Sequence, residues 1–592
     1  MTRHLSERIR HAIERHRWWV LLLFVVTLTL LLAARARAKP FWHDEVFTIL
    51  ESRLPLTTLW RASQDGLDLA PPLNTILTRV THAALGAGLI RTRLPPMCGF
   101  TAACLLVFVM VRRRSNALIG LAAAIALCFT GAFQYAYEAR GYDLTVGCFA
   151  VAFFAWSEAA RGRRRRLHLL VMGMALAAGV WAHYYAVVAF VPLAIGELVR
   201  QIGRRRVDRA SWIAFAGAAA AVLPLAPLLI SSLPQAATFW TRQETVSISN
   251  TYGEVLGAII TSRFTLSGLI VMVLIVLALF RRLRGDGRQT GGALAPSSDG
   301  GPEGPPLPIT RRGEALGRPI SISRSGGALA PPLHGPPDGP LLPTCERHEL
   351  VAGLVSLTIP ALAMLVASVT GGAFVPRYTL FADVGFALVV PLAIARFASV
   401  VAAADVILCL ILVVPLASDV VNTLASRPFE SHNPIDDRPL LTQQLARGGD
   451  IVVSGGLTYL QLWYYLSAEQ QPRAIYVADP ETELRETHTD TIDRGYLSLS
   501  RWSDVPIVAY NEFVLAQRTF YVYGCGPHWL SNRLHDDGAS ISNIRYELGC
   551  WLYRVDLPPV SNTRGQSSRI ASPSQFQDLS QNREAVTPDL YL

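Results

Sequence analysis

Long apolar runs recur along the chain to about residue 417, separated by short polar or arginine-rich connections. Each run approaches the roughly 20 residues that an α-helix needs to cross a bilayer. With 51% hydrophobic and 17% charged residues, the chain of 592 residues is also too apolar for an ordinary soluble protein. We therefore predict a polytopic α-helical membrane protein with about eleven spans: 18–34, 96–111, 115–135, 142–160, 167–183, 185–199, 210–232, 264–280, 350–369, 379–396 and 398–417.

Arginine clusters mark alternate connections, and the bias of positive charge toward the cytoplasm places those connections and the basic N-terminus, 1–17, inside. The first loop, 36–95, and everything after 418 then lie outside. Arg35, Arg37 and Lys39 fall on the external side, where we interpret them as snorkelling to the interface, with a phosphate-binding role as the alternative. Because the net charge of +10 gathers at the ends of apolar runs, no nucleic-acid partner is expected.

Three segments differ from the membrane pattern. Residues 285–346 are rich in Pro and Gly and repeat GGALAP, which is typical of a disordered insertion, here cytoplasmic. Residues 421–557 predict a small external α/β domain, with the tail 558–592 disordered; the expected strands are 451–454, 474–477, 519–523 and 551–555, with a helix at 459–466.

Cys525 and Cys550 are the two cysteines of that α/β domain. An external domain meets an oxidising compartment, where two thiols oxidise if their Cα atoms come within about 7 Å. We expect a disulfide between them, although burial of each thiol in its own strand is the alternative. The other cysteines show no metal-ligand spacing.

Four polar motifs lie on the external side. PFWHDEVFTILE, from residue 40, sets the adjacent carboxylates of Asp44 and Glu45 among apolar side chains. An aspartate near a helix start is also a common cap, so the pair alone leaves its role open. The other motifs are YEARGY, HYY and FVPRY, which contain Glu138, Arg140, Tyr142, His183, Tyr184, Arg377 and Tyr378.

In this order and on one side, the motifs PFWHDEVFT, YAYEARGYDL, AHYYAV and FVPRYTLF resemble the GT-C-fold glycosyltransferases. The likeness is to the bacterial members of glycosyltransferase family 39, relatives of protein O-mannosyltransferases and of the lipid A aminoarabinose transferase. It covers about residues 15–420 and implies a GT-C-like catalytic domain over 18–420. It further implies transfer of a sugar, with inversion, from a polyprenyl-phosphate carrier to an acceptor at the external face of a bacterial plasma (inner) membrane.

The resemblance makes Asp44 the proposed base, and chemistry explains the residue types. A carboxylate takes the proton of an attacking hydroxyl, whereas a departing phosphate needs charge stabilisation, for which Arg140 and Arg377 are candidates. Glu45 points about 100° away on a helix and is assigned to orientation of an acceptor group or a partner cation. Glu138 is left either to pair with Arg140 or to help bind a divalent cation.

Several alternatives stay open. The arginines also suit helix-end anchors, and the tyrosines suit an aromatic belt at the interface. No cofactor is assigned, and no metal ligands are. The acceptor is a lipid, a polysaccharide or a protein, and the alternative functions are a flippase or exporter of lipid-linked sugars and a scaffold that binds cell-wall polymers. The residues that we expect to bind substrate are Trp42, Glu138, Arg140, Tyr142, His183, Tyr184, Arg377 and Tyr378.

Overall fold

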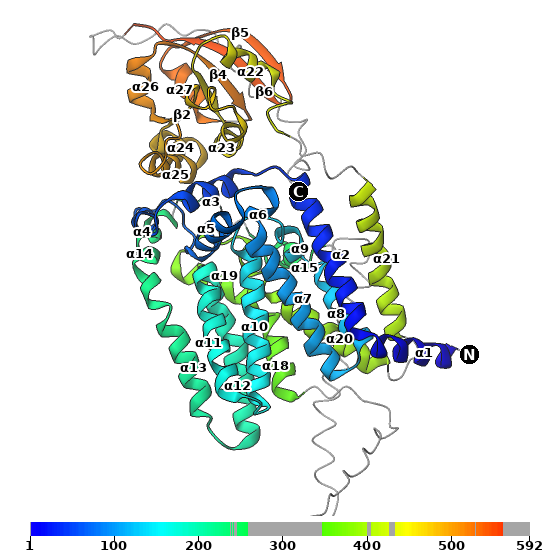
Figure 1. Ribbon diagram of the computed structural model, residues 1–592. Coiled ribbons are helices and arrows are strands. Elements are labelled where there is room, and N and C mark those ends of the chain that lie inside the picture. Colours follow the sequence, from blue (N-terminus) through cyan, green and yellow to red (C-terminus); the bar gives the residue numbers. More distant parts are fainter. Residues whose placement is uncertain are drawn as a thin grey trace, which may run out of the picture.

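The computed structural model describes residues 2–236, 238, 239, 241, 246–257, 346–398, 404–425, 433–526 and 528–559. The chain forms a helical bundle and a sheet domain that lies against one end of it (Figure 1). The predicted span 264–280, the insertion to residue 345 and the tail from 560 lie outside the described residues.

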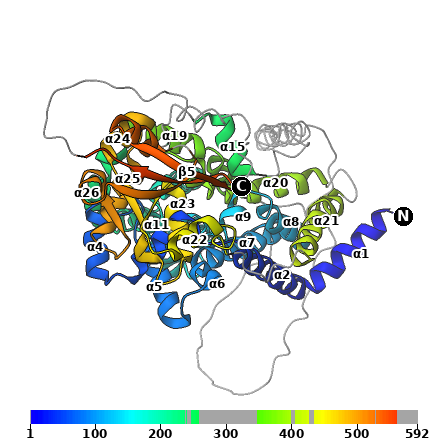
Figure 2. The ribbon, with the colours of Figure 1, turned by 90° about the horizontal axis from the view of Figure 1, so that it is seen from above.

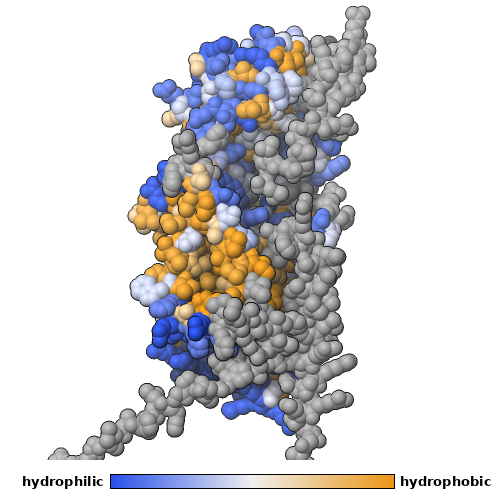
Figure 3. Space-filling view, turned by 90° about the vertical axis from the view of Figure 1, so that its right-hand side faces the viewer, coloured by the Kyte–Doolittle hydropathy of each residue, from blue (hydrophilic) through white to orange (hydrophobic). Residues whose placement is uncertain are grey.

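The bundle consists of long apolar helices with charged ends. Its surface carries an apolar band between two hydrophilic ends, as expected of a protein that spans a bilayer (Figure 3). The main helices are α1 (Thr2–Arg15), α2 (Arg17–Ala38), α7 (Leu94–Arg114), α8 (Ala117–Leu127), α10 (Tyr142–Ala160), α11 (Arg165–Ala182), α12 (Phe190–Arg204), α13 (Arg209–Ala220), α14 (Ala226–Ala236), α18 (Arg347–Ser356), α19 (Ile359–Thr370), α20 (Ala382–Ala398) and α21 (Ala404–Ala425).

Six helices in the described part of the chain are long and apolar enough to span a membrane, or seven if the bent pair α18 and α19 counts as one span. The prediction of about eleven spans is therefore too high for this part. The run 115–135 forms only the short α8, followed by a turn and α9 (Gly131–Tyr135). The run 379–396 likewise forms a shorter apolar helix, α20. Apolar composition alone does not separate a full span from a short helix buried among its neighbours.

The sheet domain contains six strands in the order β3-β2-β1-β4-β6-β5. β3, β2, β1 and β4 run parallel to one another, whereas β6 pairs antiparallel with both β4 and β5. The strands are β1 (Ile451–Ser454), β2 (Ala474–Ala478), β3 (Ile507–Ala509), β4 (Thr519–Cys525), β5 (Ser540–Glu547) and β6 (Cys550–Asp556). The helices of this domain are α22 (Pro439–Ala446), α23 (Gly456–Tyr465), α24 (Pro480–Thr487), α25 (Thr491–Ser500), α26 (Tyr510–Ala516) and α27 (Trp529–Asp536).

The four predicted strands are confirmed as β1, β2, β4 and β6. β3 was missed because it has only three residues, and β5 because its sequence SISNIRYE is polar and mostly exposed. The expected disulfide joins Cys525 and Cys550, which are register partners at the end of the β4–β6 ladder. The bond therefore links two strands that already pair.

The first loop folds as α3 (His43–Arg53), α4 (Leu56–Gln64), α5 (Leu73–Leu85) and α6 (Leu89–Thr92). These helices lie between the bundle and the sheet domain (Figure 1), and the view from above shows that the sheet domain leaves α8, α20 and α21 of the bundle uncovered (Figure 2). Val46, Phe47 and Leu50 of α3 share one buried core with Tyr459 and Tyr496 of the sheet domain. The helix that carries the DE pair is thus packed between the two parts of the molecule.

Candidate active site

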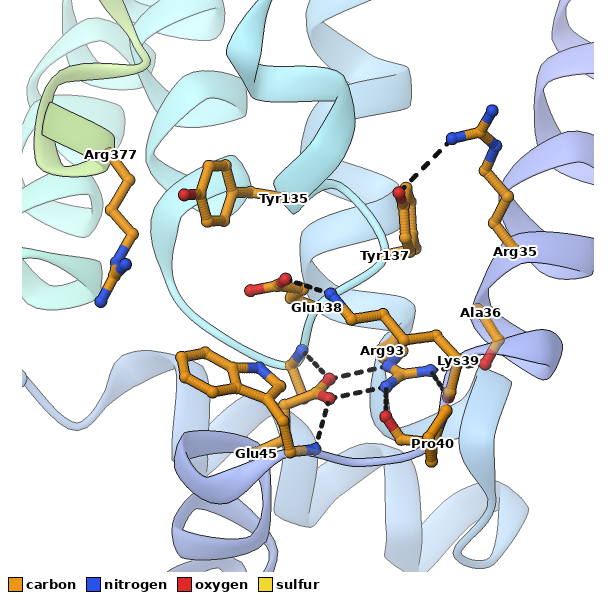
Figure 4. A network of polar contacts seen from close by, with 12 residues as sticks. Arg35, Ala36, Lys39, Pro40, Glu45, Arg93, Tyr135, Tyr137, Glu138 and Arg377 are labelled. Carbon is orange, nitrogen blue, oxygen red and sulfur yellow. Dashed lines mark hydrogen bonds and ion pairs between the residues drawn. The ribbon is translucent and has the colours of Figure 1, made fainter. Parts of the chain in front are cut away.

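Glu45 lies at the centre of a buried ion pair with Arg93. Both side chains are fully buried, and the guanidinium donates from Nε to Oε1 (2.7 Å) and from Nη2 to Oε2 (2.6 Å) (Figure 4). The carboxylate also accepts from the backbone N–H groups of Ala139 (2.7 Å) and Trp42 (3.3 Å). These four bonds occupy the acceptor capacity of the carboxylate. Of the two roles left open for Glu45, the structure places it with a partner cation.

Arg93 extends this network to the end of α2. Its remaining N–H groups donate to three backbone carbonyls, those of Ala36, Lys39 (2.8 Å) and Pro40 (3.2 Å). Glu45 and Arg93 therefore tie together the end of α2, the start of α3 and the turn before α10, because each group that they bond lies on one of those segments. Burial lowers the pKa of Arg93, but Glu45 outweighs it and the net shift is upward.

Asp44, the carboxylate that directly precedes Glu45 in the sequence, lies in a different environment. Its side chain is half-buried, and no described residue donates a hydrogen bond to its carboxylate. Arg140 Nη1 lies 3.4 Å from the Asp44 carbonyl oxygen and 3.4 Å from Thr48 Oγ1. The negative charge of Asp44 contributes to the raised pKa values of both Arg140 and Arg377, in each case against the lowering effect of burial. Asp44 is thus an acceptor with unused capacity beside two half-buried cations.

A small cleft lies at the sheet-domain end of the bundle, beside Thr48, which is one turn after Asp44 on α3. Arg140 forms an ion pair there with Asp68 (3.0 Å), and Asn74 donates to the carbonyl of Ala139 (3.0 Å). Of the two roles left open for Glu138, pairing with Arg140 is therefore not the one that the structure shows. The cleft is lined by Thr48, Asp68, Ala70, Pro71, Asn74, Thr75, Arg140, Gly141, Tyr142, Ala182 and His183.

Arg377 joins the same region from η4 (Pro376–Thr379) and donates from Nε to the Tyr142 hydroxyl (3.1 Å). The rings of His183 and Tyr378 are tilted against each other with centroids 4.4 Å apart, and the ring of Tyr142 stacks on that of Tyr378 with centroids 6.1 Å apart. Burial, together with the two arginines, lowers the pKa of His183 to about 3, so its imidazole is neutral at physiological pH. Tyr184 differs, since its ring packs on a separate apolar cluster.

Glu138 pairs with Lys39 rather than with Arg140. Burial raises the pKa of Glu138, and Lys39 opposes that shift. Arg35 likewise has defined partners: it donates to the Tyr137 hydroxyl (3.4 Å; Figure 4) and to Asp419 (2.6 Å). The side chains of Arg35 and Lys39, which we expected to snorkel, are thus each held by an acceptor within the protein.

Two buried polar atoms near this network, Glu138 Oε2 and Trp42 Nε1, have no hydrogen-bond partner among the described residues. A buried donor or acceptor left unpaired costs about 1–3 kcal/mol, so such atoms require an explanation. A divalent cation was one option for Glu138. Within the described ranges, no group of three His, Cys, Asp or Glu side chains is arranged to hold a metal ion.

The bundle, the loop helices and the sheet domain define a polytopic membrane protein with a C-terminal α/β domain. No protein-family model matches the sequence, and no curated protein does. Among solved structures, the crystal structure of ArnT from Cupriavidus metallidurans in the apo state matches with a TM-score of 0.53 and 11% identity, covering 91% of this chain and 98% of that one. The chain therefore has an ArnT-like GT-C fold, which confirms the fold expected from its motifs.

Two further structures resemble the chain more weakly. ArnT from the same organism bound to undecaprenyl phosphate matches with a TM-score of 0.47 at 11% identity, covering 91% of this chain and 98% of that one. The oligosaccharyltransferase of Archaeoglobus fulgidus in complex with Zn and sulfate matches with a TM-score of 0.43 at 11% identity, covering 85% of this chain and 67% of that one.

Sequence reasoning missed Arg93, Asp68 and Lys39 as members of the site. Arg93 directly precedes an apolar run, so it reads as a helix-end anchor. Asp68 belongs to no recognisable motif. Only Lys39 gave a signal, because a cation on the external side departed from the charge bias.

Proposed function

We propose that this protein is an integral-membrane glycosyltransferase that moves a sugar from a polyprenyl-phosphate carrier to an acceptor hydroxyl. The observation that supports it best is the environment of Asp44: a half-buried carboxylate without a hydrogen-bond donor among the described residues, beside Arg140 and Arg377. The ArnT-like fold agrees with this assignment. In the proposal, the site faces the external side of a bacterial inner membrane.

The reaction is a single displacement with inversion at the anomeric carbon. The acceptor oxygen forms a bond to that carbon while the carrier phosphate departs with the electron pair of the broken C–O bond. Asp44 takes the hydroxyl proton, which typically contributes 10²–10⁴-fold to a rate. A carboxylate already bonded to donors would be a poor base, and this is why the free acceptor capacity of Asp44 matters.

Arg140 and Arg377 supply the positive charge that the departing phosphate requires. A half-buried guanidinium presents several N–H donors in a fixed plane and stabilises anionic oxygens better in a partly dry site than in water. Tyr142 bonds Arg377 and so orients it. His183 is neutral, and we assign it to hydrogen bonding with substrate rather than to charge stabilisation.

The remaining site residues divide into a frame and a sugar-facing group. Glu45 belongs to the frame, because Arg93 and two backbone N–H groups use its carboxylate fully. Trp42 Nε1 and Glu138 Oε2 are one buried donor and one buried acceptor without partners in the described chain. We assign both to hydrogen bonds with hydroxyl groups of the sugar, which satisfy each atom on binding.

Asp44→Asn tests the proposal. Purified protein in liposomes is incubated with radiolabelled polyprenyl-phosphate sugars and crude envelope acceptor. We expect kcat to fall about 100-fold or more, with donor Kd changed only a few-fold, because asparagine keeps the shape but cannot accept the proton. Asp65→Asn, an exposed aspartate of the same loop, is the matched control and should transfer sugar normally. Near-normal turnover by folded Asp44→Asn protein would remove Asp44 as the base.

A further inference from the structure

A buried hydrogen bond joins the sheet domain to the residue that directly precedes Asp44. Tyr496, on α25, lies 3.1 Å through its hydroxyl oxygen from Nδ1 of His43, the first residue of α3. The same hydroxyl contacts the carbonyl oxygen of Gly456 on α23. Tyr496 is fully buried and His43 is 8% exposed, so solvent competes little for either bond.

The number of protons available determines which group donates in each of these hydrogen bonds. A tyrosine hydroxyl has one proton, and the Gly456 carbonyl is an acceptor only, so the hydroxyl donates to Gly456. His43 Nδ1 must then carry a proton and donate to the hydroxyl oxygen. Burial lowers the pKa of His43, which keeps the ring neutral and leaves a single N–H for this bond. One tautomer and one ring orientation of His43 are thereby selected.

Aromatic packing holds the same ring from several sides. The centroid of the His43 ring lies 5.0 Å from that of Phe47, one turn further along α3, and 5.4 Å from that of Tyr496. Tyr496 in turn contacts Tyr476 (4.4 Å) and Tyr459 (5.5 Å), both of the sheet domain. The N-terminal turn of α3 is thus fixed by groups that belong to the sheet domain.

We propose that the sheet domain sets the direction of the Asp44 carboxylate through the Tyr496–His43 hydrogen bond. This inference rests on the proposed function, and it makes Tyr496 and His43 positioning residues. Successive side chains of a helix point about 100° apart, so the rotation that seats His43 against Tyr496 also fixes where Asp44 points. Glu45 anchors the opposite side of the same turn to Arg93. Asp44 itself is left free to receive a proton.

The geometry explains why the anchor sits outside the cleft. A base that is oriented by bonds to its own carboxylate loses acceptor capacity, whereas a base oriented through its neighbours keeps it. An error of about 1 Å in the position of a catalytic group can reduce the rate by about 100-fold. An anchor outside the cleft that holds Asp44 in place therefore has a measurable effect on the rate. The sheet domain thereby gains a role in catalysis without touching substrate.

Tyr496→Phe tests the inference, since it removes one hydroxyl and keeps the ring. We expect kcat to fall about three- to tenfold with KM unchanged, because a single neutral hydrogen bond is lost and substrate contacts are not. Hydrogen exchange of the amides of α3 should quicken in the same variant. Tyr523→Phe is the matched control: Tyr523 is also fully buried in the sheet domain, but its hydroxyl bonds Glu547 (2.9 Å) on another strand.

Three outcomes decide it. A kcat decrease and faster exchange in α3 for Tyr496→Phe, with neither for Tyr523→Phe, would support the inference. Equal effects of the two substitutions would overturn it, since both would then act through general loss of domain stability. Unchanged exchange in α3 for Tyr496→Phe would also overturn it. If the wild-type protein transfers no sugar, the proposed function fails by itself, and the exchange measurement still judges whether Tyr496 fixes α3.

Discussion

Breaking the Glu45–Arg93 pair should destabilise the protein more than any exposed ion pair does. Arg93→Met removes two of the four hydrogen bonds to the fully buried Glu45 carboxylate and leaves only the two from backbone N–H groups. Three backbone carbonyls also lose their hydrogen bonds to the guanidinium. Removing one partner of a buried pair costs about 3–5 kcal/mol, because the other charge stays buried without compensation. We expect a loss of that size in the free energy of unfolding.

A double-mutant cycle separates the pair from its surroundings. Arg93→Met, Glu45→Gln and the combination are unfolded at equilibrium in mixed micelles with increasing SDS. The combined loss should fall short of the sum by about 1–3 kcal/mol, as residues in direct contact do. Arg485→Met is the control, since Arg485 is 58% exposed and lies 3.7 Å from Glu486; it should shift the midpoint little. Additive losses for the buried pair would refute the reasoning.

Three other predictions follow from the site and the sheet domain. Arg140→Ala and Arg377→Ala should raise the KM or lower the kcat for the phosphate-linked donor more than lysine does at the same positions. The reason is that lysine keeps the charge and loses only the planar fork of N–H donors. If wild type and both alanine variants have identical kinetics, the arginines are only helix-end anchors. Reduction of Cys525–Cys550 should lower the free energy of unfolding of the sheet domain by about 3 kcal/mol, measured by denaturant titration with and without reductant. Burial raises the pKa of Glu483 from 4.5 to about 8, so folding favours the protonated form of its carboxyl group. The contribution of this group to the stability of the folded protein is complete below about pH 4.5 and is lost as the pH rises through 8. Glu483→Gln should therefore raise Tm at pH 8.5 more than at pH 5.

The fold could be predicted from the sequence because its signals are local. Apolar runs of span length and alternating strands report burial directly, and they located α2, α7 and α10 as well as four of six strands. The number of spans could not be predicted the same way. Whether an apolar run crosses the membrane or ends within the bundle depends on its packing partners, as α8 shows.

The site is predictable only in part, for a related reason. Asp44, Arg140 and Arg377 stand in motifs, and the structure gathers them in one region. Their ion-pair partners are set by tertiary contacts: Arg140 meets Asp68, 72 positions away, and Glu138 meets Lys39, 99 positions away. No periodicity records such pairs. Proximity in sequence suggested Arg140 as one of two options for Glu138, and in the structure Glu138 pairs with Lys39 instead.

The location of the cleft bears on the choice between a transferase and a transporter of lipid-linked sugars. Secondary transporters bind near the bilayer midplane, between broken helices. Here the lining residues come from the first loop, from the turn before α10 and its first residue Tyr142, and from the end of α11 with His183 directly after it, all at the sheet-domain end of the bundle. The bent pair α18 and α19 does break a span, by 53°, but Leu357 and Thr358 at the break carry no ionisable group. Liposomes that contain labelled donor separate the two functions: a transporter moves label across the bilayer without acceptor, whereas a transferase labels acceptor on the donor's own side and requires Asp44.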